Sequence, residues 1–166
     1  MDDPDLVIRL AQPQDLARAG ELTYEAYANS HVMGTDPDYG AYLRDAAGHA
    51  EISEVLVAVE PDDEVIGTVR LTFPGSPMTE LAGDGEAEFR MLAVDPKAQG
   101  RGVGRALVEA CIERSRARGA HTMVISVLAG NDSAERLYER MGFERLPERD
   151  WTPAPGTDLL AWRLSL

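Results

Sequence analysis

Apolar residues gather along the chain in short runs that predict β-strands near both ends and in the middle. The run 121–128 is apolar almost throughout, which is typical of a strand in the middle of a sheet. Turn-forming residues such as Pro61-Asp62-Asp63 separate neighbouring runs. The predicted strands are Leu6–Leu10, Glu54–Val59, Val65–Phe73, Glu88–Val94, His121–Leu128, Phe143–Leu146 and Leu159–Leu164.

Three other segments place apolar residues at helical spacing. The first follows Asp15, which is suited to cap it. The second is expected to end at Gly119, and the third to begin at Asp132, form a capping box with Glu135 and stop at Gly142. The apolar face of the second helix is formed by Val103, Ala106, Leu107, Ala110 and Cys111.

Three stretches lack such periodicity. Residues 31–48 are predicted to be irregular with room for one short helix, and 152–156 to be a turn. Residues 74–85 form a loop of about a dozen residues, long enough to suggest function or mobility. Strands both precede and alternate with helices, so the sequence predicts a mixed sheet in a single domain, residues 1–166.

Charge is distributed unevenly along the chain. The net charge is −13, but residues 1–90 carry 5 basic and 19 acidic side chains, whereas 91–166 carry 11 and 10. We therefore expect neither nucleic acid nor an anionic membrane as a partner. Attraction of a cationic substrate and simple surface solubility are both compatible with the acidic first half.

The composition also bears on location. Hydrophobic residues make up 44% and charged residues 27%, an ordinary globular balance. The longest apolar runs are too short to cross a bilayer, and the first residues do not resemble a secretion signal. A single cysteine, Cys111, excludes an internal disulfide and is expected to be a core residue. The sequence therefore predicts a cytoplasmic protein.

The strongest chemical signal is a glycine-rich run between the strand that ends at Val94 and the second helix. It reads Gln99-Gly100-Arg101-Gly102-Val103-Gly104. The first N–H groups of a helix have no intrahelical partner, and the helix dipole is positive at that end. Glycines let the backbone approach a phosphate, and Arg101 and Arg105 add positive charge. These features predict a site for an anion such as a pyrophosphate.

Three other interpretations of the glycine run are weaker. A Walker loop requires Gly-Lys-Ser/Thr, which the sequence lacks. A dinucleotide-binding domain, as in an oxidoreductase, has its glycine motif early in the chain and an acidic residue about 20 positions further on. Here the glycine run lies past the middle of the chain. A helix start that binds nothing does not explain the two arginines.

The glycine run, with Met91–Pro96 before it, resembles the acetyl-CoA signature Q/R-x-x-G-x-G/A of the GNAT superfamily of N-acetyltransferases. Asn131–Ala134 and Leu137–Phe143 resemble the second sequence block of that family. The resemblance covers roughly 86–145, whereas 27–50 match no family feature. It implies an α/β fold with a mixed, mostly antiparallel sheet of about seven strands, flanked by helices and with splayed central strands.

The resemblance also implies how acetyl-CoA is bound as a cosubstrate. The pyrophosphate would lie on the N–H groups of Gly100–Gly104, and the pantetheine arm along the backbone of Leu92 and Val94. The amide of Asn131 would contact pantetheine, with Ala134 beside the cofactor. The implied cofactor-binding residues are Leu92, Ala93, Val94, Gln99, Gly100, Arg101, Gly102, Val103, Gly104, Arg105, Asn131, Ala134 and Tyr138.

The implied chemistry is direct attack of an amine on the thioester. Tyr138 occupies the family's general-acid position, although it could also be a packing residue. Glu88 matches a catalytic glutamate of some members, with Glu86 and a water relay as alternatives and a solvated or salt-bridged strand residue as the simpler interpretation. Strand alternation would place Glu88, Arg90, Leu92 and Val94 on one face, and an N–H group of 91–94 would stabilise the oxyanion.

The acceptor is open. A small, cationic primary amine is expected, and a peptide N-terminus or lysine is an alternative, as is a non-catalytic acyl-CoA-binding module. A homodimer is compatible with the sequence. No metal is expected, because the histidines lack metal-ligand spacing. Those histidines are His31, His49 and His121. Four tyrosines could line an acceptor pocket or belong to the core: Tyr24, Tyr27, Tyr39 and Tyr42. Trp151 and Trp162 are expected to be packing residues.

Overall fold

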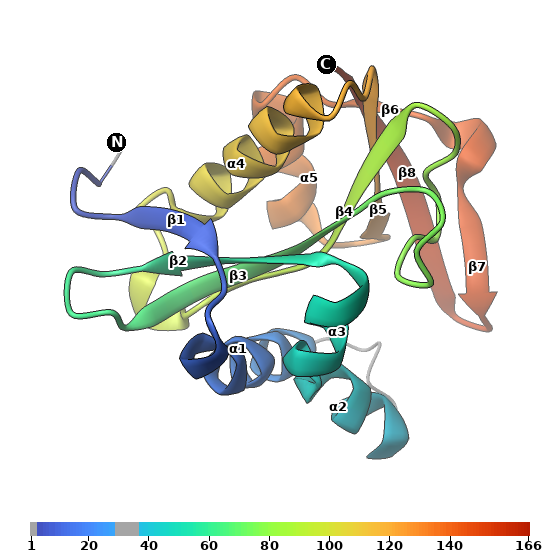
Figure 1. Ribbon diagram of the computed structural model, residues 1–166. Coiled ribbons are helices and arrows are strands. Elements are labelled where there is room, and N and C mark those ends of the chain that lie inside the picture. The colour runs from blue at the N-terminus through green and yellow to red at the C-terminus, as the bar shows by residue number, and fades with distance from the viewer. Residues whose placement is uncertain (1–2, 29–36) are drawn as a thin grey trace. The chain divides into compact units, whose positions relative to one another are not determined.

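The structure is a computed structural model that describes residues 3–28 and 37–166. Within these residues it contains five α-helices and eight strands (Figure 1). The helices are α1 (Leu16–Ala28), α2 (Pro37–Arg44), α3 (Ala46–Ile52), α4 (Val103–Ala117) and α5 (Asp132–Arg140). The strands are β1 (Val7–Leu10), β2 (Glu54–Val59), β3 (Val65–Thr72), β4 (Glu86–Val94), β5 (Thr122–Leu128), β6 (Glu144–Arg145), β7 (Trp151–Ala154) and β8 (Thr157–Ser165).

The chain forms two compact units, and β4 contributes to both. The first unit contains residues 1–71 and 91–111, and the second contains 72–90 and 112–166. The hydrogen-bonded strand order is β1-β2-β3-β4-β5-β8-β6, with β7 also paired to β8. This mixed, mostly antiparallel sheet confirms the predicted fold class, with one strand more than expected.

In the first unit, β1, β2 and β3 are antiparallel neighbours. Helices α1, α2 and α3 lie together on one side of these strands (Figure 1). Residues of α1, α3, β2, β3 and the end of β4 form one apolar core. Its buried members are Ala19, Leu22, Ala46, Val57, Val59, Val65 and Ala93.

Acidic side chains directly precede two helices of the first unit, α1 and α3. Asp15, which precedes α1, accepts hydrogen bonds from the Gln12 N–H and the Arg9 guanidinium and is 2% exposed. Asp45 caps α3 by accepting from the Gly48 N–H at 3.0 Å. The segment 31–48 was expected to be largely irregular. Its described part contains α2, which fits the one short helix expected there, and the start of α3, whose Asp45 cap the pattern did not reveal.

The second unit is centred on β5 and β8, which pair in antiparallel register from Thr122↔Ser165 to Leu128↔Leu159. The first residues of β4 pair in parallel with β5, while β6 and β7 pair with β8. Residues 152–156 were predicted to be a turn, but Trp151–Ala154 form β7. Only the end of that segment turns, where Gly156 has a φ of 82°.

Helix α5 also begins differently from the expectation. The side chain of Asn131, and not that of Asp132, accepts from the Ala134 N–H at 3.2 Å and caps the helix. The end is as predicted, because Gly142 has a φ of 95° and its N–H bonds the Glu139 carbonyl.

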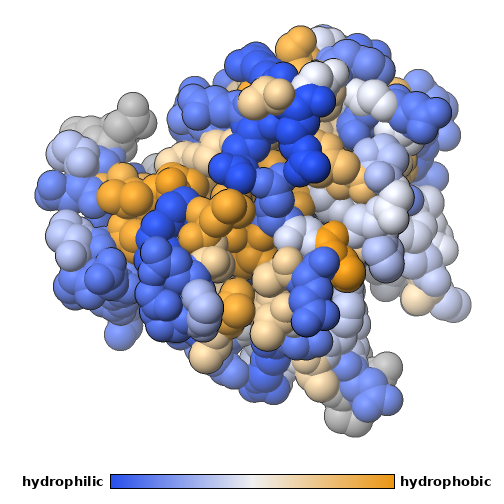
Figure 2. All heavy atoms as spheres, viewed as in Figure 1, coloured by the Kyte–Doolittle hydropathy of each residue, from blue (hydrophilic) through white to orange (hydrophobic). Residues whose placement is uncertain are grey.

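The exposed large apolar residues of the described chain include Val7 and Leu10 on β1. Figure 2 shows apolar surface where β1 lies, amid largely hydrophilic surroundings. Among the described residues, no helix has the length and apolar character needed to span a membrane.

Close packing of α4 on β3 depends on Gly67. A Cβ atom at this position would lie 2.8 Å from Val103 Cγ1 and 3.0 Å from Leu107 Cδ1. Val103 and Leu107 are 2% and 0% exposed, so neither can move aside easily. Gly67 therefore sets how near the first turn of α4 comes to the strand.

We expect Gly67→Ala to reduce the free energy of unfolding by about 1–3 kcal/mol through overpacking. Urea unfolding measures this change. Gly83→Ala is the matched control, since its Cβ would meet nothing closer than 3.5 Å. Equal stability of the two variants would contradict the role given to Gly67.

Candidate active site

Strand β4 is kinked at Met91, whose φ of 57° is unusual for a residue other than glycine. The ladder with β5 covers Glu86↔Thr122 to Glu88↔Val124, before this kink. Arg90, Leu92 and Val94 are half-buried and alternate with the buried Met91 and Ala93, as the predicted common face requires, whereas Glu88 is buried. The predicted splay of the central strands stays a prediction.

The loop after β4 is shaped by backbone geometry. Asp95 accepts from the Lys97 N–H at 3.0 Å and from Arg18 at 2.8 Å. These bonds, the Lys97 bond first, lower the pKa of Asp95. Gly100 and Gly102 then have φ values of 82° and 77°. A Cβ at Gly100 would meet no atom within 4 Å, so that glycine is needed for its conformation and not for space.

Helix α4 begins directly at this loop. The Ala106 N–H bonds the Gly102 carbonyl at 3.0 Å, while Val103 is buried and anchors the first turn. The N–H groups of a helix's first turn have no partner within the helix. Because Gly100, Gly102 and the neighbouring backbone are solvent-accessible, an anion can reach these donors.

The two arginines of the loop are already paired. Arg101 donates to Glu60 at 2.6 Å and also binds Asp3, which together raise its pKa. Arg105 pairs with Glu109 at 2.9 Å, one helical turn further on. Carboxylates therefore balance both charges, and the backbone N–H groups are the main attraction for an anion.

The second unit holds the other predicted cofactor and acid residues on α5. Asn131 is exposed and caps the helix, and Ala134 is half-buried in the first turn. Tyr138 is 6% exposed, and its ring packs against Phe89 and Phe143 with centroids 5.7 and 5.5 Å away. Packing thus holds the tyrosine ring in a fixed orientation.

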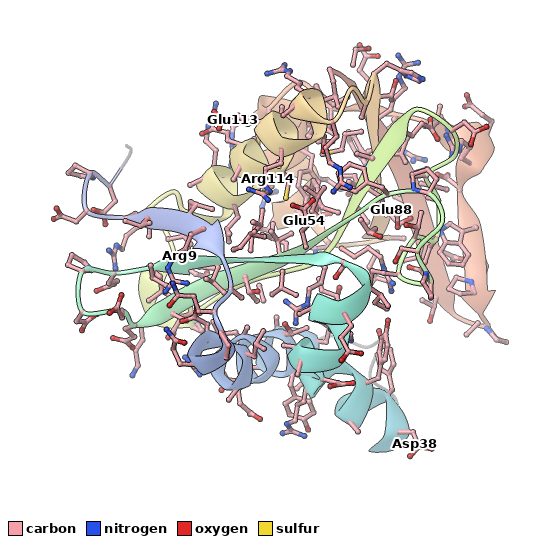
Figure 3. The ribbon with its side chains drawn as sticks, in the orientation of Figure 1. Arg9, Asp38, Glu54, Glu88, Glu113 and Arg114 are labelled. Atoms are coloured by element: carbon pink, nitrogen blue, oxygen red, sulfur yellow. The ribbon has the colours of Figure 1, made fainter. Side chains whose placement is uncertain are left out.

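Glu88 lies on β4 and is 1% exposed (Figure 3). Its Oε1 accepts from the N–H groups of Leu81 at 2.6 Å and Ala82 at 2.8 Å, and from Glu80 at 3.2 Å. Its Oε2 has a single long bond, 3.3 Å, from Glu80 N–H. The interpretation as a solvated residue is wrong. Glu88 fixes the 80–82 backbone and retains accepting capacity at Oε2.

Glu86, the alternative base, is engaged at both oxygens. Oε1 accepts from the Gly83 N–H at 2.7 Å and Oε2 from Arg149 at 2.9 Å. Burial alone would raise the pKa of Glu86, but these bonds outweigh it and the net shift is downward. Glu86 is thus a weaker base than an ordinary glutamate.

Glu80 was not among the residues named from the sequence. Its carboxylate pairs with Arg90 at 2.7 Å, and its side chain is 34% exposed. Burial raises the pKa of Glu80, and Glu88 adds to this while Arg90 opposes it. Arg90 also donates to the Met78 carbonyl at 2.9 Å, and Arg149 donates to the Leu81 carbonyl. The loop 74–85 is therefore tied down by charged side chains.

Several of the remaining candidates make structural contacts in the described residues. Cys111 is fully buried, as expected. His49 is buried and accepts from Arg70, His121 bonds Thr122, and His31 lies outside the described residues. The indole N–H of Trp151 donates to Ser126. Among the described residues, one cluster of three carboxylates is spaced closely enough to hold a metal ion: Glu60, Asp62 and Glu64. Glu60 is already paired with Arg101.

Comparison with known proteins identifies the family. Residues 19–143 match the Acetyltransferase (GNAT) family, a range that runs through both units. The chain belongs to this family, so the sequence-based identification of the GNAT superfamily is confirmed.

Curated relatives carry the name mycothiol acetyltransferase. The Cellulomonas flavigena protein is 36% identical over 95% of this chain and 48% of its own length. The Beutenbergia cavernae protein is 46% identical over 69% of this chain and 38% of its own length. The chain thus spans about half the length of these relatives, or less.

Solved structures share the fold. A GCN5-related N-acetyltransferase from Kribbella flavida is 25% identical, with 98% of each chain covered and a TM-score of 0.73. The Salmonella typhimurium protein yncA, solved with its cofactor acetyl-CoA, is 25% identical, with 97% of this chain and 94% of that chain covered and a TM-score of 0.69.

The role of Glu88 as an anchor predicts a local change. We expect Glu88→Ala to speed amide hydrogen exchange at Glu80, Leu81 and Ala82 by about tenfold or more, because their acceptor is lost. Glu113→Ala, an exposed carboxylate of the same unit, should leave these rates unchanged. Unaltered exchange in Glu88→Ala would show that the loop is held by other contacts.

Proposed function

We propose that this chain transfers an acetyl group from acetyl-CoA to a primary amine of a small molecule. The observation that carries the proposal is the loop in which Gly100 and Gly102 take left-handed φ values and lead into the N-terminus of α4. The family match and the acetyl-CoA bound to the yncA protein support the same cosubstrate.

In this proposal the backbone N–H groups of Gly100–Gly104 bind the CoA pyrophosphate, with Gln99, Arg101 and Arg105 bordering it. The backbone of Leu92–Val94 bonds the pantetheine arm beyond the Met91 kink. Asn131 and Ala134 contact the cofactor from α5. No metal takes part.

The reaction needs a neutral amine, stabilisation of the oxyanion and a proton for the departing thiolate. A thiol titrates near 8.5 and a phenol near 10, so a tyrosine can protonate the thiolate without a large pKa shift. We assign this step to Tyr138, whose ring is fixed by Phe89 and Phe143. An N–H group of 91–94 stabilises the oxyanion. The amine nitrogen forms the new amide bond as the thioester C–S bond breaks.

We assign deprotonation of the ammonium to Glu88, directly or through a water. Its Oε1 is fixed by backbone donors, which leaves Oε2 oriented to accept a proton or a water hydrogen. Glu86 is less suitable because Arg149 and the Gly83 N–H lower its pKa. Glu80 is the stronger competitor, since its pKa is raised.

For the acceptor we propose only a chemical class, a primary amine. The acidic first half of the chain favours an amine that is cationic in solution. The name of the curated relatives suggests an amine related to mycothiol as a first acceptor to assay. A peptide N-terminus or lysine is the alternative acceptor. A homodimer and a cytoplasmic location stay predictions.

The proposal predicts thiol release from acetyl-CoA with a panel of primary amines. Tyr138→Phe should lower kcat by about 10²–10⁴-fold, the range for a general acid, while CoA affinity is kept. Glu88→Gln should lower kcat/KM by about 10²-fold or more, as expected for loss of a general base, whereas Glu80→Gln should lower it by less than about threefold.

Two outcomes would contradict this account. CoA binding without thiol release across the panel would indicate a non-catalytic acyl-CoA-binding module. Thermal protection by NAD and not by CoA would indicate a dinucleotide-binding protein. Separately, a loss of kcat/KM of that size in Glu80→Gln but not in Glu88→Gln would move the base from Glu88 to Glu80.

A further inference from the structure

Arg70 on β3 is a fully buried guanidinium in the first unit, with 0% of the residue exposed. Its Nε donates to His49 Nδ1 at 3.3 Å, Nη1 to Thr68 Oγ1 at 2.8 Å and Nη2 to Thr23 Oγ1 at 3.1 Å. All three acceptors are neutral. Among the described residues no carboxylate lies within 4.0 Å of this guanidinium.

The acceptors around Arg70 are oriented in advance. Thr23 donates its hydroxyl to the Ala19 carbonyl at 2.8 Å, and Thr68 donates to the Leu56 carbonyl at 2.9 Å. Each hydroxyl therefore has only lone pairs to offer Arg70. The guanidinium has five N–H donors, three of which have these acceptors.

This arrangement differs from the other arginines discussed above. Arg9, Arg18 and Arg101 each pair with a carboxylate, whereas Arg70 has no carboxylate partner among residues 3–28 and 37–166. Burial lowers the pKa of Arg70 to about 10, so it remains protonated at neutral pH. A buried ion without a counter-ion is costly, and a bound anion would recover part of that cost.

The position of Arg70 relates it to the proposed reaction centre. β3 and β4 are joined by the loop 73–85 at one end, and at the other the Asp95 N–H bonds the Ile66 carbonyl at 2.9 Å. The two strands are therefore antiparallel. From the Ile66–Asp95 bond, the same number of residues along each strand leads to Arg70 on β3 and to Met91 on β4. Arg70 therefore lies beside Met91, on the strand next to the one proposed to hold the thioester.

We propose that Arg70 binds an acidic group, a carboxylate or its equivalent, on the amine acceptor. The inference rests on the proposed acetyl transfer and narrows its substrate to an amine that also carries an anion. Such a zwitterionic molecule is compatible with the acidic surface, which attracts its ammonium group, while the buried cation selects its acid group.

Access requires one neighbour to move, and Tyr42 fits this role. Its ring packs edge-on against His49 at 4.9 Å, and 38% of the residue is exposed. A rotation of this half-exposed side chain would open a path toward His49 and Arg70. An anion that enters there can accept from the two guanidinium N–H donors that have no acceptor in the described chain.

The test compares amines that differ only in charge. Glycine, β-alanine and 4-aminobutyrate are each assayed beside their carboxamides by thiol release from acetyl-CoA. For at least one pair, wild-type kcat/KM should favour the carboxylate by about tenfold or more, the size of a charge-assisted bond. Arg70→Met should reduce this preference to below about threefold.

Arg44→Met is the matched control, because Arg44 is exposed and paired with Glu21, and it should keep the preference. Arg70→Met should remain at least as stable as wild type, since an apolar residue replaces a buried charge. Thr23→Val keeps the arginine, removes one acceptor and should give an intermediate preference. A wild-type preference for carboxamides, or the same preference in Arg70→Met, would overturn the proposal.

A binding measurement separates this proposal from the proposed function. Acetate is titrated into ¹⁵N-labelled protein while the Arg70 Nε–H resonance is followed. A saturable shift of this resonance that is abolished by Arg70→Met supports the anion site, whether or not any amine is acetylated. If the shift is seen but no amine is acetylated, only the acetyl-transfer proposal fails. No shift at Arg70 would defeat the anion site even if amines are acetylated.

Discussion

The backbone of β4 is the constraint on which the other features depend. Its first residues pair with β5, its last residue is followed by the Asp95–Ile66 bond to β3, and Met91 between them takes a left-handed φ. The residues of β4 before Met91 belong to the second unit, and those from Met91 onward belong to the first. The strand also ends at the glycine loop, so the direction in which β4 leaves the kink sets where α4 begins.

Charge is treated differently at three buried or loop positions. Arg101 is balanced by Asp3 and Glu60, and this leaves the loop backbone as the anion-binding element. Glu88 is stabilised by backbone N–H groups. Arg70 has neutral acceptors in the described chain and keeps its net charge. A fold gains little stability from such a charge, so a role in recognising a ligand accounts for it better.

The sequence predicted most of the elements because long periodic or apolar runs dominate them. It identified the glycine loop, since left-handed turns and helix starts have strong residue preferences. It missed α3 and the Asn131 cap, because several polar residues compete for each cap position. β7 was missed because Pro153 and Pro155 resemble a turn, although an edge strand tolerates proline.

The candidate site was predictable where a motif lies in one continuous segment. The loop 99–105 and Tyr138 could be named from sequence alone. The engagement of Glu86 by Arg149 could not, because it joins positions 63 residues apart. The lack of a carboxylate beside Arg70 among the described residues was also hidden, since it depends on how segments far apart in the sequence come together. The left-handed conformation of Met91 has no sequence signature.

The most direct test of the central claim is the affinity for CoA, measured by calorimetry on loop variants. If the backbone of the loop binds the pyrophosphate, Gly102→Val should weaken binding by at least about tenfold, because valine cannot adopt the left-handed φ without strain. Arg101→Gln should cost less than about threefold, since that charge is already balanced. Unchanged affinity in a folded Gly102→Val, or a larger loss in Arg101→Gln, would contradict the account.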